Sequence, residues 1–220
     1  MRMLKTIARL APVIATVFVG AALLAGCGVN KIPTQDEATK TAWAEVQNQY
    51  QRRADLIPNL VATVKGYAAQ EKSVLVEVTE ARASATQVKV DASTITDPAK
   101  FQEYSAAQDK LSGVLGRLMM IQESYPDLKS NQNFLALQSQ LEGTENRIAI
   151  ARRDYNQTAQ VYNTTLRTFP SVLWAKTLYS GQKPAQLFQA TATAQSAPNV
   201  DFSAPPAPTV NTGPAPAPAQ

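Results

Sequence analysis

The sequence predicts an all-α fold: an antiparallel bundle of three to four long helices with a short C-terminal helix. Residues 36–179 contain few glycines and long stretches of helix-forming side chains. Apolar side chains recur there at helical spacing in three segments. Aspartate, asparagine and proline stand where those segments begin and end. About 150 residues are available for folding, which is enough for one ordinary hydrophobic core.

Residues 1–26 have the features of a secretory signal peptide. Residues 1–9 carry three positive charges, and an uncharged apolar run of 15 residues extends from Leu10 to Leu24. A membrane-spanning helix needs about 20 apolar residues, whereas the apolar part of a signal peptide has about 7–15. The length of the run therefore favours a signal peptide.

The end of this run, Leu24-Ala25-Gly26-Cys27, resembles a bacterial lipobox. Small side chains before the cut let the backbone enter a signal peptidase, and the Cys27 thiol is the nucleophile that accepts a diacylglyceryl group. We expect cleavage between Gly26 and Cys27 and a lipid on Cys27. The alternative is an uncleaved N-terminal anchor in which the cysteine is incidental.

A lipid with two or more acyl chains holds a protein firmly at a membrane. The expected location is therefore the bacterial cell envelope. Gly28 stands where a signal for retention in the inner membrane would place Asp. This favours the outer membrane, facing the periplasm, if the host has one, and otherwise the outer face of the cytoplasmic membrane.

Composition excludes several classes of function. Three of the 21 basic side chains lie in the predicted signal peptide, so the mature chain has 18 basic and 17 acidic side chains and no excess charge for binding nucleic acid. The chain has no histidine and one cysteine. Ser-His-Asp and Cys-His catalysis therefore lack a base, and zinc or copper would lack preferred ligands. We expect no catalytic residue, no metal and no cofactor.

Residues 27–35 are predicted to form a linker, and the first helical segment follows it. Its apolar seam runs through Pro58, where we expect a kink or a division into two nearly collinear helices. Arg53 and Glu71 are polar positions on this seam, and each should find a partner on another helix or at a frayed edge. The seam consists of Trp43, Val46, Tyr50, Ile57, Leu60, Val64, Tyr67, Val74, Val78 and Ala81.

The second segment begins at Asp97-Pro98, a favourable N-cap followed by proline at the first helical position. Its seam consists of Phe101, Tyr104, Leu111, Leu115, Leu118 and Tyr125. Pro126 ends it, and Asp127 to Ser130 form a turn that leads to Asn131 as the next cap.

The third segment is the most regular. Its large side chains recur every seven residues, and smaller ones stand three positions later, which suits a seam that lets a neighbouring helix approach closely. The large row is Phe134, Leu141, Ile148, Tyr155, Tyr162 and Phe169. A short final helix from Ser171 to Tyr179 is expected to complete the bundle, which spans residues 36–183. The Pro- and Ala-rich residues 184–220 are predicted to be a disordered tail.

Two charged groups are candidate partner-binding sites. Their arginines could meet carboxylates of a partner or lipid phosphates, and ion pairing within and between helices is the alternative. The first group is Arg52, Arg53 and Asp55; the second is Glu142, Glu145, Arg152 and Arg153, with Asp154 beside them.

Several motifs resemble the LemA family from about Trp43 to Phe188. The most specific are Gln51-Arg52-Arg53-Ala54-Asp55-Leu56-Ile57-Pro58-Asn59-Leu60, Glu123-Ser124-Tyr125-Pro126-Asp127-Leu128, Leu141-Glu142-Gly143-Thr144-Glu145-Asn146-Arg147 and Arg152-Arg153-Asp154-Tyr155. The family often has histidine where this chain has Ala54, which argues against an indispensable metal or proton-transfer role at that position.

The resemblance implies a helical bundle, a cell-envelope location and association with membrane-bound zinc metalloproteases of the HtpX type. The resemblance does not imply any particular reaction. Our leading hypothesis is a non-enzymatic, lipid-anchored adaptor that binds an envelope protein such as a membrane metalloprotease. The alternative is a structural or membrane-shaping protein that self-assembles. An enzymatic function is our third hypothesis, because it would need a polar, concave pocket that helix seams of this kind rarely leave.

Overall fold

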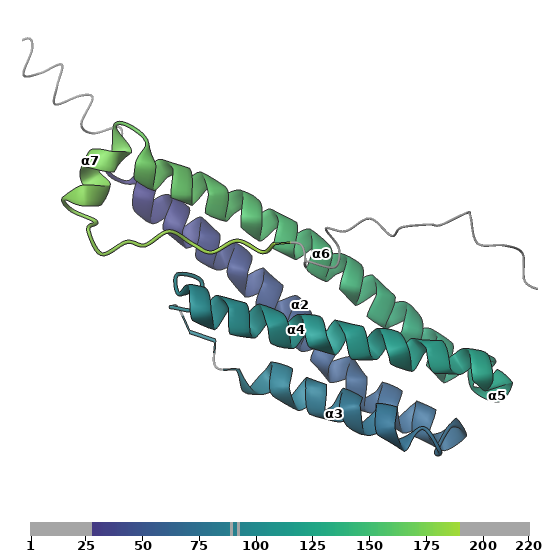
Figure 1. Cartoon of the computed structure of the whole chain (residues 1–220). Helices are drawn as coiled ribbons and strands as arrows, with labels where there is room; N and C mark the ends of the chain where they lie inside the picture. The colour runs from purple at the N-terminus through teal and green to yellow at the C-terminus, as the bar shows by residue number, and fades with distance from the viewer. Residues whose placement is uncertain (1–27, 89, 92, 190–220) are drawn as a thin grey trace, which may run out of the picture. The chain divides into compact units, whose positions relative to one another are not determined.

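The computed structural model describes residues 28–88, 90–91 and 93–189, which are mostly helical and contain no strand (Figure 1). The predicted all-α class is therefore confirmed. The predicted signal peptide, Cys27 and residues 190–220 lie outside the described part. The elements are α2 (Lys31–Tyr67), α3 (Lys72–Gln87), α4 (Pro98–Met120), the 3-10 helix η1 (Ile121–Ser124), α5 (Pro126–Lys129), α6 (Gln132–Arg167) and α7 (Ser171–Lys176).

The two longest helices, α2 and α6, pack side by side and run in opposite directions (Figure 1). The row of large side chains on α6 faces this seam, since Phe134, Leu141, Ile148, Tyr155 and Tyr162 are all buried. Trp43 of α2 meets Tyr155, with 5.3 Å between the ring centroids. The predicted burial is wrong for the last member of the row. Phe169 is 80% exposed, because α6 ends two residues before it.

Pro58 does not divide α2. The helix continues through it, although proline has no N–H to donate to the carbonyl of Ala54 one turn earlier. The Nε–H of Arg82, on α3, donates to that carbonyl over 2.7 Å instead. The freed acceptor is therefore satisfied by a neighbouring helix. Of the two alternatives for this proline, a kink or a division, the division is wrong.

The chain turns instead at Ala68 to Glu71, which the sequence pattern placed within one helix. Ala68 leaves helical geometry with φ −129° and ψ 53°, and the Glu71 N–H donates to the Ala68 carbonyl over 3.1 Å. After this turn α3 packs against α4, forming a second helix pair beside α2 and α6 (Figure 1). The bundle thus has four long helices. Val78 and Ala81 are buried as predicted, but they lie on this separate helix.

The predicted caps are confirmed. Asp97 Oδ1 accepts hydrogen bonds from the backbone N–H groups of Ala99 and Lys100, and Asn131 Oδ1 accepts one from Phe134. The second segment ends earlier than predicted, because α4 tightens into η1 after Met120. The final helix is also shorter, since α7 ends at Lys176 rather than at Tyr179.

Residues 182–189 form an extended strap along the bundle, which includes the first residues of the segment that composition assigns to the tail. Asn163 donates to the carbonyl of Ala185 and accepts from its N–H, both over 2.8 Å, and Asn156 makes the same two bonds with Phe188 over 2.9 Å. Phe188 is buried in an aromatic cluster. The described fold therefore continues past residue 183. At its other end, α2 begins at Lys31, within the predicted linker.

The substitute donor at Pro58 gives the first prediction. Arg82→Met should lower the free energy of unfolding by about 1–2 kcal/mol, because the partly buried Ala54 carbonyl loses its partner. In a Pro58→Ala background the same substitution should cost less than about 0.5 kcal/mol, because the new alanine N–H can bond to Ala54. Urea unfolding of the four proteins measures both values. An equal loss in the two backgrounds would contradict this role of Arg82.

Candidate functional site

The residue with the most unusual environment is Arg53, in the middle of α2. It continues the apolar seam of that helix, between Tyr50 and Ile57, and only 1% of it is exposed. A buried guanidinium is costly unless it is paired and hydrogen-bonded. The contacts of Arg53 therefore decide whether the site is structural or open to a partner.

Arg53 is bonded to two other helices at once. Nη1 donates to Ser112 Oγ over 2.6 Å and to Glu145 Oε1 over 2.9 Å. Nη2 donates to the Gln108 carbonyl over 3.2 Å and to Gln108 Oε1 over 2.5 Å. The side-chain amide of Gln108 donates in turn to the Ala85 carbonyl over 3.2 Å. This network connects all four long helices, because its members come from α2, α3, α4 and α6.

The charge of Arg53 is balanced at one side of the bundle. The Glu145 side chain is 39% exposed, so its carboxylate keeps part of its hydration while it pairs with the buried cation. The guanidinium carbon also lies 5.0 Å from the centre of the Tyr50 ring, within the range of a cation–π contact. The arrangement lowers the cost of burial without removing both ions from water.

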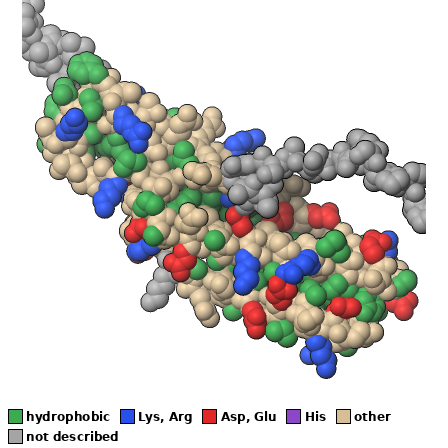
Figure 2. Space-filling model, viewed as in Figure 1, with side chains coloured by type: hydrophobic (Ala, Val, Ile, Leu, Met, Phe, Trp, Pro, Cys, Tyr) green, Lys and Arg blue, Asp and Glu red, His purple; other side chains and the backbone are tan. Residues whose placement is uncertain are grey.

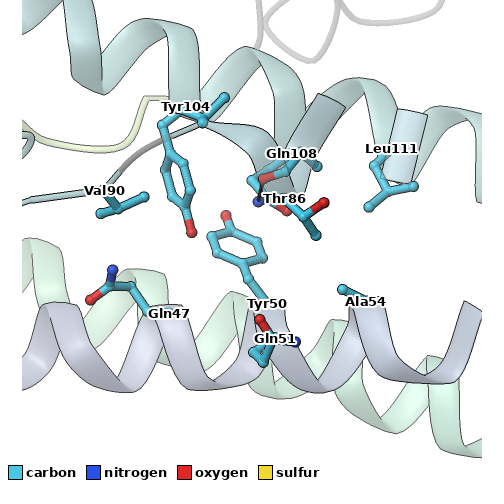
Figure 3. Close-up of a pocket in the computed structure, with 11 residues that line it drawn as sticks. Gln47, Tyr50, Gln51, Ala54, Thr86, Val90, Tyr104, Gln108 and Leu111 are labelled. Carbon is cyan, nitrogen blue, oxygen red and sulfur yellow. Dashed lines mark hydrogen bonds between the residues drawn. The ribbon is translucent and has the colours of Figure 1, made fainter. Parts of the chain in front are cut away.

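A pocket of about 130 Å³ lies beside this network, between α2, α4 and the end of α3 (Figure 3). Figure 3 shows the hydroxyls of Tyr50 and Tyr104 pointing toward each other across it. Burial raises the pKa of both phenols, which keeps them protonated at neutral pH. Among the described residues that line the pocket, none is acidic. The pocket therefore offers hydrogen-bond donors and acceptors but no group that could act as a general base near neutral pH.

The structure separates the predicted partner-binding residues into two sets. Arg53 and Glu145 meet in the network. Arg152 pairs with Asp109 of α4 over 3.2 Å, and its guanidinium carbon lies 4.3 Å from the centre of the Phe188 ring. These three side chains contact other parts of the fold.

The remaining four predicted residues are exposed. Three of them make polar contacts with neighbours on the same helix: Asp55 accepts from Gln51, Glu142 accepts from Gln138, and Arg153 contacts Asp154. Arg52 is the fourth exposed residue and lies on α2. We call Arg52, Asp55, Glu142 and Arg153 the exposed charged residues of α2 and α6.

Sequence reasoning missed the α4 members of the network. Gln108 lies four residues after Tyr104 and three before Leu111, so it is a polar residue on an apolar seam. That position could have identified it as a partner for Arg53. Ser112 and Asp109 lie beside the seam, where polar residues are ordinary, and nothing in the pattern distinguishes them.

Glu71, the other polar position on the first seam, also has its expected partner. Its carboxylate accepts a hydrogen bond of 2.9 Å from the Tyr125 hydroxyl. Within the described ranges, no three acidic, cysteine or histidine side chains come together in a way that could hold a metal ion. In the same ranges, no helix combines the length and the apolar character needed to cross a bilayer.

Comparison with known proteins identifies relatives of most of the chain. The model of the LemA family matches residues 42–202. The magnetosome protein MamQ 2 of Paramagnetospirillum magneticum is 26% identical over 177 residues, which cover 73% of this chain and 64% of that protein. The protein LemA of Metamycoplasma hominis is 24% identical over 140 residues, covering 64% of this chain and 60% of the relative. The chain thus spans less than two thirds of the length of these relatives.

The network predicts that two adjacent arginines differ sharply in their effect on stability. Arg53→Met should lower the free energy of unfolding by about 2 kcal/mol or more, because Gln108 and Ser112 lose their donor and Glu145 loses its cation. Arg52→Met, on the exposed side of the same helix, should change it by less than about 0.5 kcal/mol. Urea unfolding followed by circular dichroism measures both. Similar losses for the two variants would show that Arg53 has no special role.

Proposed function

This chain belongs to the LemA family, and from that membership we propose that it is a non-enzymatic adaptor that binds another protein of the cell envelope. Membership implies an envelope-associated protein, without specifying an activity. The proposed partner is a membrane protein, such as a metalloprotease of the HtpX type, which the family resemblance suggests.

The observation that carries the proposal is the set of exposed charged residues of α2 and α6. Its four residues belong to the motifs that resemble the family, and their side chains are exposed. The hydrogen bonds of Asp55, Glu142 and Arg153 are with neighbours on their own helices. The Arg153 side chain is 73% exposed. Exposed charges of both signs contribute little to stability, whereas complementary charges orient a partner and speed its association.

The interior supports a binding role over catalysis. Arg53, Glu145 and Arg152 are engaged in contacts between helices. The pocket beside Arg53 is lined by tyrosine, glutamine, threonine and apolar side chains, and none of these is a base that could activate a nucleophile. A bundle fixed in this way is suited to present a surface.

The lipid on Cys27 is part of the proposal. Lipidation would keep the bundle at the membrane where a membrane-bound partner resides, and it would raise the local concentration of each for the other.

A self-assembling structural protein is the second candidate. A groove of about 400 Å³ between α2 and α6 is lined mainly by small residues, including Ala38, Ala42 and Ala151. Small side chains let another helix approach closely, so a second copy of this chain is the occupant that this alternative requires.

Site-specific photocrosslinking tests the adaptor. With a photoreactive residue in place of Arg153, the full chain expressed in its own envelope should yield a crosslink to one other envelope protein. The matched position is the exposed Lys110 on α4, which should not yield this product. An Asp55→Lys substitution should weaken the crosslink from position 153 if the partner also meets α2, because it reverses a charge that the partner would contact.

Two crosslinking outcomes would count against the adaptor. A product from both positions would mean that the contact is unspecific. A product containing only this chain would favour self-assembly.

A Cys27→Ser variant should leave an unprocessed precursor without labelled fatty acid, and normal processing and labelling in that variant would contradict the lipid anchor.

A further inference from the structure

A cluster of exposed apolar residues lies at the end of the bundle formed by α7. Phe169 is 80% exposed, Leu173 53% and Leu178 65%, and these three lie within ten residues of one another. Trp174 and Tyr179 are half-buried in the same segment. We call residues 28–34 and 167–183 the α7 end. Elsewhere the exposed large apolar side chains are spread along the helices, for example Val76 and Ile150.

The charges at the α7 end have one sign. Residues 155–189 contain three basic side chains, Arg167, Lys176 and Lys183, and no aspartate or glutamate. All three are exposed, and so is Lys31 in the first turn of α2. Figure 2 shows hydrophobic and basic side chains together over α7, whereas the acidic side chains lie over the other helices. The surface is therefore both apolar and positive.

The chain enters the bundle at this same end. The backbone of Gly28 packs against α7 so closely that a Cβ there would lie 3.4 Å from Trp174 Nε1 and 3.5 Å from Pro170 Cγ. Cys27 is one peptide bond earlier, and consecutive Cα atoms are about 3.8 Å apart. Gly28, which directly follows the residue proposed to carry the lipid, thus lies against α7.

From these observations we propose that the α7 end rests on a membrane surface that contains anionic lipids. Phe169, Leu173 and Leu178 would enter the boundary between headgroups and acyl chains, with Trp174 and Tyr179 at the headgroup level that such rings prefer. The basic side chains around them would meet lipid phosphates. The α2 and α6 helices would then extend from the membrane for up to about 55 Å.

A lipid surface fits these observations better than a protein partner. An exposed apolar cluster among basic side chains matches an anionic interface, and the proposed lipid on Cys27 would bring it there. The acidic Asp36 lines a hollow with Gly181 and Lys183 at the border of this surface. The position of that lipid belongs to the proposed function, but the exposed apolar cluster and the one-sided charge do not depend on it.

The two tryptophans of the chain allow a direct test. Trp43 is buried, and its position 12 residues into α2 places it about 18 Å from the start of the helix. Trp43→Phe leaves Trp174 as the reporter, and Trp174→Phe leaves Trp43. In the full chain bound to vesicles of brominated phosphatidylglycerol, Trp174 should lose a large part of its emission and Trp43 should not.

Matched variants identify the contacts. In the Trp43→Phe background, Phe169→Ser with Leu178→Ser should reduce the quenching of Trp174. Ile150→Ser, at a half-exposed position in the middle of α6, should leave it unchanged. Lys176→Glu with Lys183→Glu should reduce it as well, and Lys110→Glu should not. Vesicles of brominated phosphatidylcholine, or high salt, should give weaker quenching.

The outcomes distinguish this surface from the anchor. If Cys27 carries labelled fatty acid but Trp174 is not quenched, the lipid anchor is supported and the proposed membrane contact of the α7 end is wrong. If Trp174 is quenched although Cys27 carries no lipid, the membrane contact of the α7 end is supported and the lipid anchor is wrong. Equal quenching in both kinds of vesicle would overturn the role of anionic lipid. A photocrosslink from position 169 to a protein, with Trp174 unquenched, would assign the surface to a protein partner.

Discussion

One buried cation determines how the helices of this bundle meet. Arg53 lies between two hydrophobic clusters. One is aromatic and includes Tyr50 and Tyr104; the other is aliphatic and includes Ile57 and Leu111. Leucine or methionine could fill the space that Arg53 occupies, but neither could bond to α4 and α6 together. The guanidinium needs Gln108, Ser112 and Glu145 in fixed positions, so it restricts the alignment of α2, α4 and α6 along their axes.

Other features of the fold follow the same rule that a freed polar group finds a partner on a neighbouring element. Pro58 leaves the Ala54 carbonyl without its helical donor, and Arg82 of α3 supplies one. The extended strap has no strand beside it, and Asn156 and Asn163 satisfy the backbone of Phe188 and Ala185. These contacts hold α3 and the strap against the central helix pair. The interior polar groups thus serve the fold, and the exposed charges remain available for a partner.

The sequence predicts those parts of the structure that depend on local patterns. The all-α class, the buried row from Phe134 to Tyr162 and the caps at Asp97 and Asn131 follow from spacing and capping chemistry. The need of Arg53 for a partner was also predictable, because it interrupts an apolar seam. The identity of that partner was not, since Glu145 is 92 residues away along the chain.

Where local patterns failed, a contact between distant segments decided the structure. The seam of the first segment keeps its register beyond Tyr67, and only the packing of α3 on α4 requires the turn at Ala68. The composition after Pro184 is typical of a disordered tail, but two asparagines on α6 and an aromatic cluster bind its first residues. The exposed charged residues of α2 and α6 and the α7 end could be recognised only when the helices were assembled, because exposure depends on which side of each helix is covered.

The central claim is that the buried Arg53 and the partly exposed Glu145 form a coupled pair, and a double-mutant cycle tests it most directly. The free energies of unfolding of the unchanged chain, Arg53→Met, Glu145→Gln and the double variant give the coupling energy. For a hydrogen-bonded pair with one buried partner, we expect a coupling of about 2 kcal/mol, so that the double variant is more stable than the sum of the single losses predicts. Additive losses would show that the two residues act independently and would contradict the role assigned to this pair.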